Sequence, residues 1–452
     1  MEYLSTRDKT LRKSAAQAIT MGLSRDGGLF TPVTFPSLSA LEVETLCGMP
    51  YRKRAAYVMG KFLEEFRPEE LNLFAKNAYG PDRFDHPDVA PLHKMDKRTW
   101  CLELWHGPTS AFKDMALQML PQLLSASLRL TGEKKTACIL AATSGDTGKA
   151  AMEGFADVDQ TRILVFYPEN GVSEIQKLQM VTQEGANVGV CAVKGNFDDA
   201  QNGVKRIFSD EALREQLAGR GYFLSSANSI NWGRILPQVV YYISAYCDLL
   251  NAKEIKLGEP VNFCVPTGNF GNILACYYAK RMGLPVGKLI CASNCNDVLT
   301  EFIRTGVYDR NREFHTTMSP SMDILISSNL ERLIYLIAGE DSGKTRELVG
   351  SLGGSGRYMI TDEMKAKLGD FAAGYASEEE TAEQIRAVYE KTGYVMDTHT
   401  AVASCVCRQY QSETGDKKKC VAASTASPYK FAKSVMTAID GKYAASDELA
   451  LI

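Results

Sequence analysis

Beyond about residue 99, short apolar runs rich in β-branched and aromatic residues alternate with longer segments of helical periodicity. Each run has the length of a strand and ends near turn residues, as expected for strands inside a sheet. Strands that alternate with helices predict an α/β fold in which a mostly parallel sheet is covered by helices on both faces. The predicted strands are 138–142, 163–167, 188–193, 222–225, 261–265, 289–292 and 420–423, and predicted helices include 173–183 and 272–282.

Residues 1–95 follow a different pattern from the rest of the chain. Helical periodicity dominates at 54–66 and 68–78, and glycine and proline mark the turns between such segments. Residues 25–30 predict a turn that leads into an extended segment. We therefore predict a small, mainly helical N-terminal domain over residues 1–95, followed by an α/β region over residues 96–452.

Three other segments have recognisable patterns. Residues 235–250 form an apolar-rich run that proline, glutamine and serine interrupt, which indicates a core helix rather than a membrane span. Residues 378–388 predict an exposed amphipathic helix. Residues 351–356, rich in glycine and serine, predict a flexible loop that serves either as a connector or as a ligand lid.

The composition is typical of a globular enzyme and argues against several other classes of protein. Hydrophobic residues make up 45% of the 452 residues, which suffices for a packed core. The net charge of −3 favours neither nucleic acid nor an anionic membrane as a partner. The 12 cysteines lack the spacing of metal sites, so we expect no metal centre and reduced thiols in a cytoplasmic protein. The first residues carry charges and no apolar stretch, so we expect no signal peptide.

One lysine, Lys113, stands out because of its neighbours in the sequence. It follows a turn at Gly107 and Pro108, comes directly after Phe112 and opens a helical pattern. A lysine held in an apolar pocket loses its proton more readily and can attack an aldehyde. Most lysines are solvated surface charges, so Lys113 becomes a candidate nucleophile only where other segments supply a matching site.

A glycine-rich turn at 265–272 connects a predicted strand to a predicted helix. Glycines let the backbone fold so that successive N–H groups point at one spot, and a helix N-terminus adds partial positive charge. The turn matches neither the Walker pattern nor the dinucleotide-binding pattern. It predicts either a phosphate site or an ordinary turn. The residues concerned are Gly268, Asn269, Phe270, Gly271 and Asn272.

A second turn from a strand to a helix contains residues suited to a small carboxylate. Hydroxyl groups and free N–H groups at a helix start can bind an anion. The alternative is an ordinary capped helix, with Ser144 or Asp146 as the N-cap. The residues concerned are Thr143, Ser144, Gly145, Asp146 and Thr147.

Two further segments that follow strands carry polar side chains. Thr425 can hydrogen-bond a heteroaromatic nitrogen, whereas Ser427 and Pro428 are typical of an ordinary helix start. In the segment 228–234, Arg234 can hold a phosphate group in bidentate fashion, and Asn231 offers an amide close by. Structural hydrogen bonding is the alternative for each of these side chains.

Together these motifs resemble the threonine synthase family. The resemblance rests on five runs that occur in this order: His-Gly-Pro-Thr-x-Ala-Phe-Lys-Asp, Thr-Ser-Gly-Asp-Thr-Gly, Asn-Ser-Ile-Asn-x-x-Arg, Pro-Thr-Gly-Asn-Phe-Gly-Asn and Ser-Thr-Ala-x-Pro-x-Lys-Phe. Residues 3–7 and 22–29 resemble the family's N-terminal domain. The match spans almost the whole chain and is similar to the longer type found in fungi and bacteria. The plant-type regulatory extension is absent, so activation by S-adenosylmethionine is not expected.

The resemblance implies a tryptophan-synthase-β-like fold, with parallel-rich sheets and an active site between two α/β subdomains within residues 96–452. The cofactor would be pyridoxal 5′-phosphate, bound as a Schiff base to Lys113. Residues 268–272 would hold its phosphate and Thr425 would face its pyridine nitrogen. Residues 143–147 would hold the substrate's α-carboxylate.

The implied reaction converts O-phospho-L-homoserine and water to L-threonine and phosphate, and Arg234, with Asn231 nearby, would contact the substrate. Ser427 stands where the family often has a histidine, and Trp232 lies in a stretch that is usually less bulky, so either residue could reshape the substrate pocket. The expected protein is a cytoplasmic monomer or homodimer. Two alternatives remain: a phospho-lyase of the same fold that releases 2-oxobutyrate, and a non-catalytic binding homologue.

Overall fold

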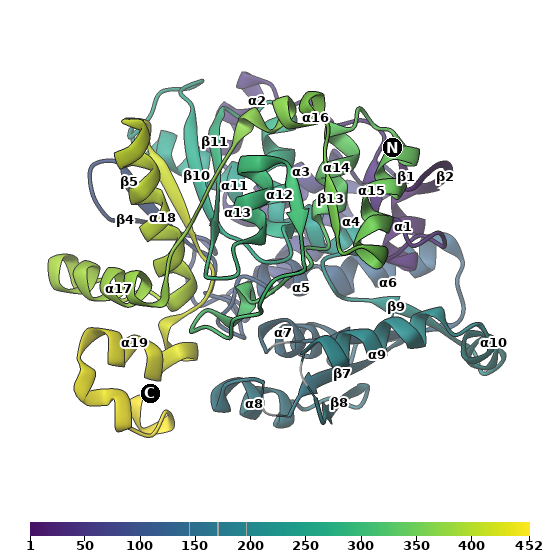
Figure 1. The fold of residues 1–452 in the computed structure, drawn as a ribbon. Coiled ribbons are helices and arrows are strands. Elements are labelled where there is room, and N and C mark those ends of the chain that lie inside the picture. Colours follow the sequence, from purple (N-terminus) through teal and green to yellow (C-terminus); the bar gives the residue numbers. More distant parts are fainter. Residues whose placement is uncertain (144, 170, 196) are drawn as a thin grey trace.

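Two parallel-rich sheets, each packed against helices, form the body of the molecule (Figure 1). The structure is a computed structural model that describes residues 1–143, 145–169, 171–195 and 197–452. The larger sheet has six strands in the order β14-β11-β10-β15-β5-β4, of which the β4–β5 pair is antiparallel and the other pairs are parallel. Its strands are β4 (Leu92–Lys94), β5 (Thr99–Glu103), β10 (Val261–Pro266), β11 (Val286–Ser293), β14 (Phe371–Tyr375) and β15 (Cys420–Ser424).

The smaller sheet has four strands in the order β8-β7-β6-β9, and all its pairs are parallel. It lies with its helices α7 to α10 in the lower part of Figure 1. Its strands are β6 (Thr136–Ala142), β7 (Thr161–Pro168), β8 (Val188–Val193) and β9 (Tyr222–Ser226). Every strand predicted from the sequence is thus confirmed, and these strands divide between the two sheets.

Helices cover both faces of each sheet, as alternate residues of the central strands show. Along β10, Phe263 lies in the main hydrophobic core with α11 and α12, whereas the next residue, Cys264, packs in a second cluster with α18. Along β6, Ile139 lies in the main core and Leu140 packs in a separate cluster with α9. Successive side chains of a strand point to opposite faces, so the predicted coverage of both faces is confirmed.

The helices packed around the two sheets begin or end close to the predicted positions. The helices predicted at 173–183 and 272–282 are α8 and α12, and the predicted core helix at 235–250 lies within α11. These helices are α5 (Asp114–Leu117), α6 (Leu120–Thr131), α7 (Asp146–Phe155), α8 (Glu174–Val181), α9 (Phe197–Ser209), α10 (Glu211–Gly219), α11 (Trp232–Asn251), α12 (Gly271–Arg281), α13 (Val298–Thr305), α18 (Thr398–Thr414) and α19 (Ala432–Ile439). No helix in the described ranges combines the length and the apolar composition that a membrane span requires.

The N-terminal region is mainly helical, as predicted, and also contains a small antiparallel sheet of order β2-β1-β3. Its elements are β1 (Glu2–Ser5), β2 (Asp8–Ser14), α1 (Ala15–Met21), β3 (Phe30–Pro32), α2 (Ala40–Cys47), α3 (Tyr51–Gly60) and α4 (Pro68–Ala78). Tyr3 and Phe62 pack against Trp232 of α11, with ring centroids 5.1 and 5.7 Å apart. This region therefore shares its core with the rest of the chain, and a domain boundary near residue 95 stays a prediction.

The polar segment after β11 contains one clear departure from the sequence prediction. The predicted loop at 351–356 is wrong, because α15 continues through Gly354 and ends before Gly356, whose φ of 75° suits glycine. The exposed helix predicted near residue 378 is confirmed as α17, which Ser377 caps. The elements here are β12 (Val307–Asp309), α14 (Leu330–Ile337), α15 (Ser342–Gly354), β13 (Arg357–Met359), α16 (Asp362–Ala366) and α17 (Glu378–Thr392), with 3-10 helices at Pro320–Met322, Lys367–Asp370, Pro428–Phe431, Gly441–Ala445 and Leu449–Leu451.

Candidate active site

A cavity of about 550 Å³ lies where the carboxyl ends of strands from both sheets meet. In parallel α/β sheets this edge is where ligands bind, because the loops after the strands gather there. Most residues predicted for the site line this cavity: Lys113, Thr143, Asp146, Thr147, Arg234, Gly268, Asn269, Phe270, Gly271, Asn272 and Thr425. Gly145 and Asn231 are not among the lining residues, and Ser144 lies outside the described residues.

Lys113 stands at the N-terminus of α5, on a loop that is attached to the end of β15. Phe112 N–H donates to the Thr425 carbonyl at 2.8 Å, and Ser427 N–H donates to the Ser110 carbonyl at 3.0 Å. The Lys113 ammonium lies 4.0 Å from the centroid of the Phe112 ring, and no hydrogen bond joins it to another described residue. These contacts fix the base of the side chain and leave its Nζ free within the cavity.

The surroundings of Lys113 favour its neutral form. Burial lowers the pKa of its amine to about 8, since a buried charge loses its hydration. The carboxylate of Asp146 acts in the opposite direction, whereas the cations Arg234 and Lys430 lower the pKa further. A substantial fraction of Lys113 is therefore neutral near pH 8, as a nucleophile or a proton acceptor requires.

Residues 268–272, which we call the glycine-rich loop, turn from β10 into α12. Phe270 is the N-cap of α12 and has a φ of 63°, in the left-handed region. A Cβ on Gly268 would lie 2.5 Å from the Ser321 carbonyl oxygen, so this position accepts only glycine. The loop therefore brings the first N–H groups of an 11-residue helix to the cavity wall.

Asn272 in this loop offers an unused donor. Its Oδ1 accepts hydrogen bonds from the hydroxyls of Tyr241 and Tyr242, which fixes the orientation of the amide. Its Nδ2 is buried and has no partner among the described residues. A buried donor without a partner is costly unless a ligand satisfies it. The loop thus has the donors that a phosphate monoester such as that of pyridoxal phosphate requires.

Thr425 follows β15 and is 5% exposed, on the cavity wall. No hydrogen bond joins its hydroxyl to another described residue, although its carbonyl accepts from Phe112. The hydroxyl is therefore available to a ring nitrogen. The helix start predicted two residues later is also present, because Ser427 is the N-cap of a 3-10 helix that begins at Pro428.

Residues 143–147, which we call the threonine loop, turn from β6 into α7. The hydroxyl of Thr143 accepts from the N–H groups of Gly145 at 3.0 Å and Gly148 at 2.8 Å. The predicted N-cap at Ser144 or Asp146 is wrong, because Gly145 is the N-cap of α7. Gly145 has a φ of 130°, and a Cβ there would lie 2.3 Å from Gln176. Thr143 therefore already occupies the N–H of Gly145, one of the groups expected to bind a carboxylate, and the N–H of the following Gly148.

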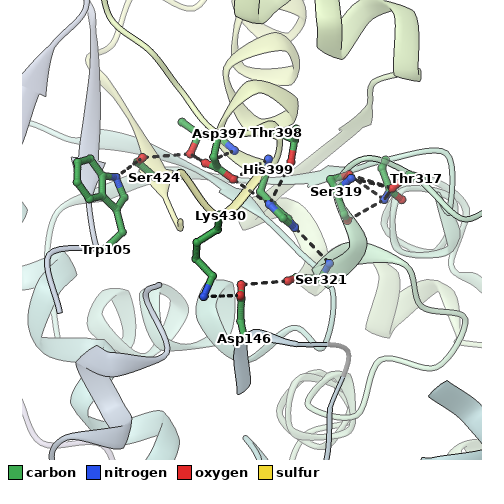
Figure 2. Close-up of polar contacts among 12 residues, drawn as sticks. Trp105, Asp146, Thr317, Ser319, Ser321, Asp397, Thr398, His399, Ser424 and Lys430 are labelled. Atoms are coloured by element: carbon green, nitrogen blue, oxygen red, sulfur yellow. Dashed lines mark hydrogen bonds and ion pairs between the residues drawn. The ribbon is translucent and has the colours of Figure 1, made fainter. Parts of the chain in front are cut away.

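Asp146 in the threonine loop is a buried carboxylate with its own cation. Its Oδ1 lies 3.0 Å from Nζ of Lys430 (Figure 2). The same oxygen accepts from Nε2 of Gln176 at 3.0 Å. Burial alone would raise its pKa, but the charges of Lys430 and Lys113 and the Gln176 bond lower it to about 2. The sequence indicated no role for Lys430, although it stands in the same motif as Thr425.

Arg234 and Asn231, predicted as neighbours in one site, have different surroundings. Arg234 is buried on the cavity wall, donates to the Ala227 carbonyl and has an Nε without a partner among the described residues. Burial lowers its pKa to about 10, so it remains a cation at neutral pH. Asn231 caps α11 by accepting from Gly233 at 2.9 Å, and its Nδ2 donates to two carbonyls. Its substrate contact stays a prediction without geometric support.

Two side chains on the cavity wall had no assigned role in the sequence prediction. Asn228 lines the cavity, and its Oδ1 is buried without a partner among the described residues. His399 also lines the cavity: its Nδ1 lies 2.8 Å from Asp397, and its Nε2 accepts from Ser321 N–H at 3.2 Å (Figure 2). Neither the position of His399 nor its partners follow from the sequence pattern, because no motif marks the start of α18 and its partner Ser321 lies 78 residues away in the chain.

Known families and proteins match nearly the whole chain. The family described as pyridoxal-phosphate dependent enzyme matches residues 85–426, and the threonine synthase N terminus matches residues 2–79. Threonine synthase of Pseudomonas aeruginosa is 39% identical over 442 residues, which cover 96% of this chain and 90% of that protein. Threonine synthase-like 1 of Homo sapiens is 42% identical over 456 residues. The match covers 97% of this chain but only 60% of that protein's length.

A solved structure agrees with this assignment. The structure of pyridoxal-phosphate-bound threonine synthase from Brucella melitensis superimposes with a TM-score of 0.89 at 40% identity, covering 97% of this chain and 91% of that chain. The predicted tryptophan-synthase-β-like fold and the predicted cofactor, pyridoxal 5′-phosphate, are thereby confirmed. The chain belongs to the threonine synthase family of pyridoxal-phosphate-dependent enzymes.

Proposed function

We propose that this protein is a lyase that converts O-phospho-L-homoserine and water to L-threonine and phosphate. The observation that carries the proposal is one cavity in which Lys113, with its readily deprotonated amine, faces two separate groups of anion donors. One group is the glycine-rich loop with Asn272, and the other contains Arg234. Two anion sites beside one reactive amine match a phosphorylated cofactor and a phosphorylated substrate.

The residues present fit pyridoxal phosphate. The glycine-rich loop would hold its phosphate, Thr425 would meet its ring nitrogen and Lys113 would bind its aldehyde carbon. When bound, this cofactor withdraws electrons from the amino acid and makes the protons on the α- and β-carbons more acidic. The neutral Lys113 amine takes the α-proton, passes it on, and then takes a β-proton. The bond between the γ-carbon and the phosphate oxygen breaks and the γ-carbon gains a proton. Water adds its oxygen at the β-carbon and loses a proton to the departing phosphate, and Lys113 returns a proton to the α-carbon.

Arg234 and Asn228 would bind the phosphate of the substrate. Arg234 is a buried cation with an unpaired Nε. Asn228 lies on the same wall, and its Nδ2 would be the donor to the phosphate, since its Oδ1 can only accept. A buried guanidinium stabilises the charge that grows on a departing phosphate more strongly than it would in water. The N–H groups of the threonine loop that Thr143 leaves free would bind the α-carboxylate and orient the α-proton toward Lys113.

Identification of the product tests the proposal. The cofactor-loaded protein is incubated with O-phospho-L-homoserine, and products are identified by proton NMR together with a phosphate assay. Threonine and phosphate in equal amounts support the proposal. 2-Oxobutyrate with ammonia would assign the protein to the phospho-lyases of the same fold. No turnover, and no change in cofactor absorbance on mixing with the protein, would identify a binding homologue.

The remaining expectations concern the state of the protein. We propose that it acts in the cytoplasm as a monomer or homodimer on small-molecule substrates, with residues 1–95 as its N-terminal domain. Light scattering after size-exclusion chromatography measures the oligomeric state. Limited proteolysis between residues 79 and 96 tests the boundary.

A further inference from the structure

A buried ion pair next to Lys113 has no part in the steps described above. Nζ of Lys430 lies 3.0 Å from Oδ1 of Asp146, and their side chains are only 2% and 5% exposed. Removing two charges from water costs several kcal/mol per ion, and a pair of this kind persists only with good geometry and further hydrogen bonds. Figure 2 shows the pair beside Ser321, which approaches Asp146 from the other side.

Lys430 has partners for all three of its ammonium protons. Besides Asp146, it donates to the Thr109 carbonyl at 2.9 Å and to Oε1 of Gln179 at 2.9 Å. Thr109 belongs to the loop that carries Lys113, Asp146 to the start of α7 and Gln179 to α8. One ammonium group therefore connects the lysine-bearing loop to the two helices that pack beside the smaller sheet.

The Asp146 carboxylate is likewise surrounded by donors. Gln176 donates to Oδ1 at 3.0 Å, and the Ser321 hydroxyl lies 3.5 Å from Oδ2. Ser321 is itself held by His399, which accepts its N–H at 3.2 Å. Asp146 thus contacts α8 and the 3-10 helix Pro320–Met322, which His399 of α18 holds in turn, and none of these contacts involves Lys113.

The charges that act on Lys113 come from three places in the fold. Asp146 favours its protonated form, while Arg234 and Lys430 favour its neutral form. Asp114, the next residue, is turned away and accepts from Thr109 N–H and hydroxyl at 2.8 Å each. Without Lys430, Lys113 would become the principal cation near the Asp146 carboxylate, and Coulomb attraction would keep the proton on it.

We propose that Lys430 is a positioning residue of the active site: it pairs with Asp146, ties that carboxylate to the Lys113 loop and leaves the Lys113 amine free to give up its proton. This inference rests on the proposed role of Lys113 as the reactive amine. The Asp146–Lys430 pair would then have a role beyond packing. An isolated Asp146 carboxylate would favour the protonated form of Lys113, whereas a carboxylate paired with Lys430 keeps its orientation and favours that form less.

The test measures the pKa of Lys113 in the full-length, cofactor-free protein. Acetic anhydride reacts with neutral amines, so the pH dependence of acetylation at Lys113, read by peptide mass spectrometry, gives its pKa. Lys430→Met keeps the apolar stem and removes the charge. We expect it to raise the pKa of Lys113 by about one unit, at the lower end of the ~1–3 units that a nearby charge produces. Lys433→Met, the same change at an exposed residue of α19, should leave it unchanged.

For a second variant we expect a shift of the Lys113 pKa in the opposite direction. This variant also provides a test if the first variant fails to fold. Asp146→Asn removes the anion and should lower the pKa of Lys113, and the double variant should fall between the two single variants. An unchanged pKa in Lys430→Met, or a raised pKa in Asp146→Asn, would overturn the inference. If circular dichroism shows that Lys430→Met is unfolded, the pKa of Lys113 in Asp146→Asn alone tests the inference. These readouts need neither cofactor nor turnover, so they fail independently of the product assay on the unaltered protein.

Discussion

The two loops that face Lys113 both connect a strand to a helix through glycine-containing turns, but they offer different chemical groups to the cavity. Both the glycine-rich loop and the threonine loop bring a helix N-terminus to the cavity. The glycine-rich loop leaves the Nδ2 donor of Asn272 open, with its amide held by two tyrosines. The threonine loop uses its own Thr143 hydroxyl to occupy two N–H groups and adds a buried carboxylate, Asp146.

This difference matches two kinds of ligand. A cofactor phosphate that stays bound through every turnover suits rigid donors with no competing partner in the protein. A substrate that enters and leaves suits a loop in which Thr143 already satisfies two N–H groups, because these bonds limit its rearrangement when the site empties. The comparison teaches that a glycine next to a helix start predicts the backbone path, whereas the neighbouring side chains decide whether the N–H groups remain available.

Lys113→Ala should have the largest effect on turnover, because the Lys113 amine would react with both the cofactor bound by one loop and the substrate bound by the other. We expect turnover of O-phospho-L-homoserine to fall by at least ~10²–10⁴-fold, the usual contribution of a positioned acid–base group. Borohydride treatment of the loaded protein should then leave no cofactor attached at position 113, as read by mass spectrometry. Lys97→Ala, an exposed lysine, is the matched control. If Lys113→Ala turned over substrate at the wild-type rate, Lys113 would not be the reactive amine that both loops face.

Asn272→Asp tests the glycine-rich loop alone. The new carboxylate keeps the acceptors for Tyr241 and Tyr242 but replaces the open donor with a negative charge facing the phosphate. We expect cofactor affinity to fall between about 10-fold and 1000-fold, the range that Coulomb repulsion at contact distance gives for intermediate dielectric values.

Fluorescence titration of the cofactor-free protein measures that affinity. Asn77→Asp, which adds the same charge on the exposed face of α4, should leave it unaltered. If Asn272→Asp binds pyridoxal phosphate as tightly as the unaltered protein, the glycine-rich loop does not hold the phosphate and the contrast between the loops fails.

The rate at which cofactor attaches should report the ionisation of Lys113. Neutral amine is the nucleophile, so below its pKa of about 8 the rate constant should rise about tenfold per pH unit and then level off. Stopped-flow absorbance of the cofactor-free protein mixed with pyridoxal phosphate gives this profile. A rate that keeps rising toward pH 10 would mean that Lys113 titrates like an ordinary surface lysine.

Much of this fold follows from the sequence, because buried parallel strands form continuous apolar runs. The strand β10 and the glycine-rich loop after it were both predicted, since local residues determine them. The short strand β14 was not predicted, because its small residues and glycine carry a weak strand signal. The helix at 351–354 was missed for the opposite reason: glycine and serine favour a loop locally, but α15 continues through them to its end.

The site was predictable where one segment supplies the chemistry and unpredictable where partners come from far apart. Lys113 and Thr425 could be chosen because their segments, together with the others, resemble one family. The partner of Asp146 is Lys430, almost 300 residues along the chain, and no local pattern connects them. Asn231 shows the converse: its amide caps α11, and the sequence could not distinguish a cap from a substrate contact.

Thr143→Val should have the smallest effect and falls on the threonine loop. The substitution keeps the shape of the side chain but leaves the N–H groups of Gly145 and Gly148 without their acceptor, which costs about 1–3 kcal/mol of the free energy of unfolding. Because the loop then holds the carboxylate less well, KM for the substrate should rise several-fold while cofactor affinity stays constant. Thr143→Ser retains the hydroxyl and should restore both stability and KM. A change in cofactor affinity as large as that of Asn272→Asp would show that the two loops do not act separately, since only the glycine-rich loop should govern the phosphate.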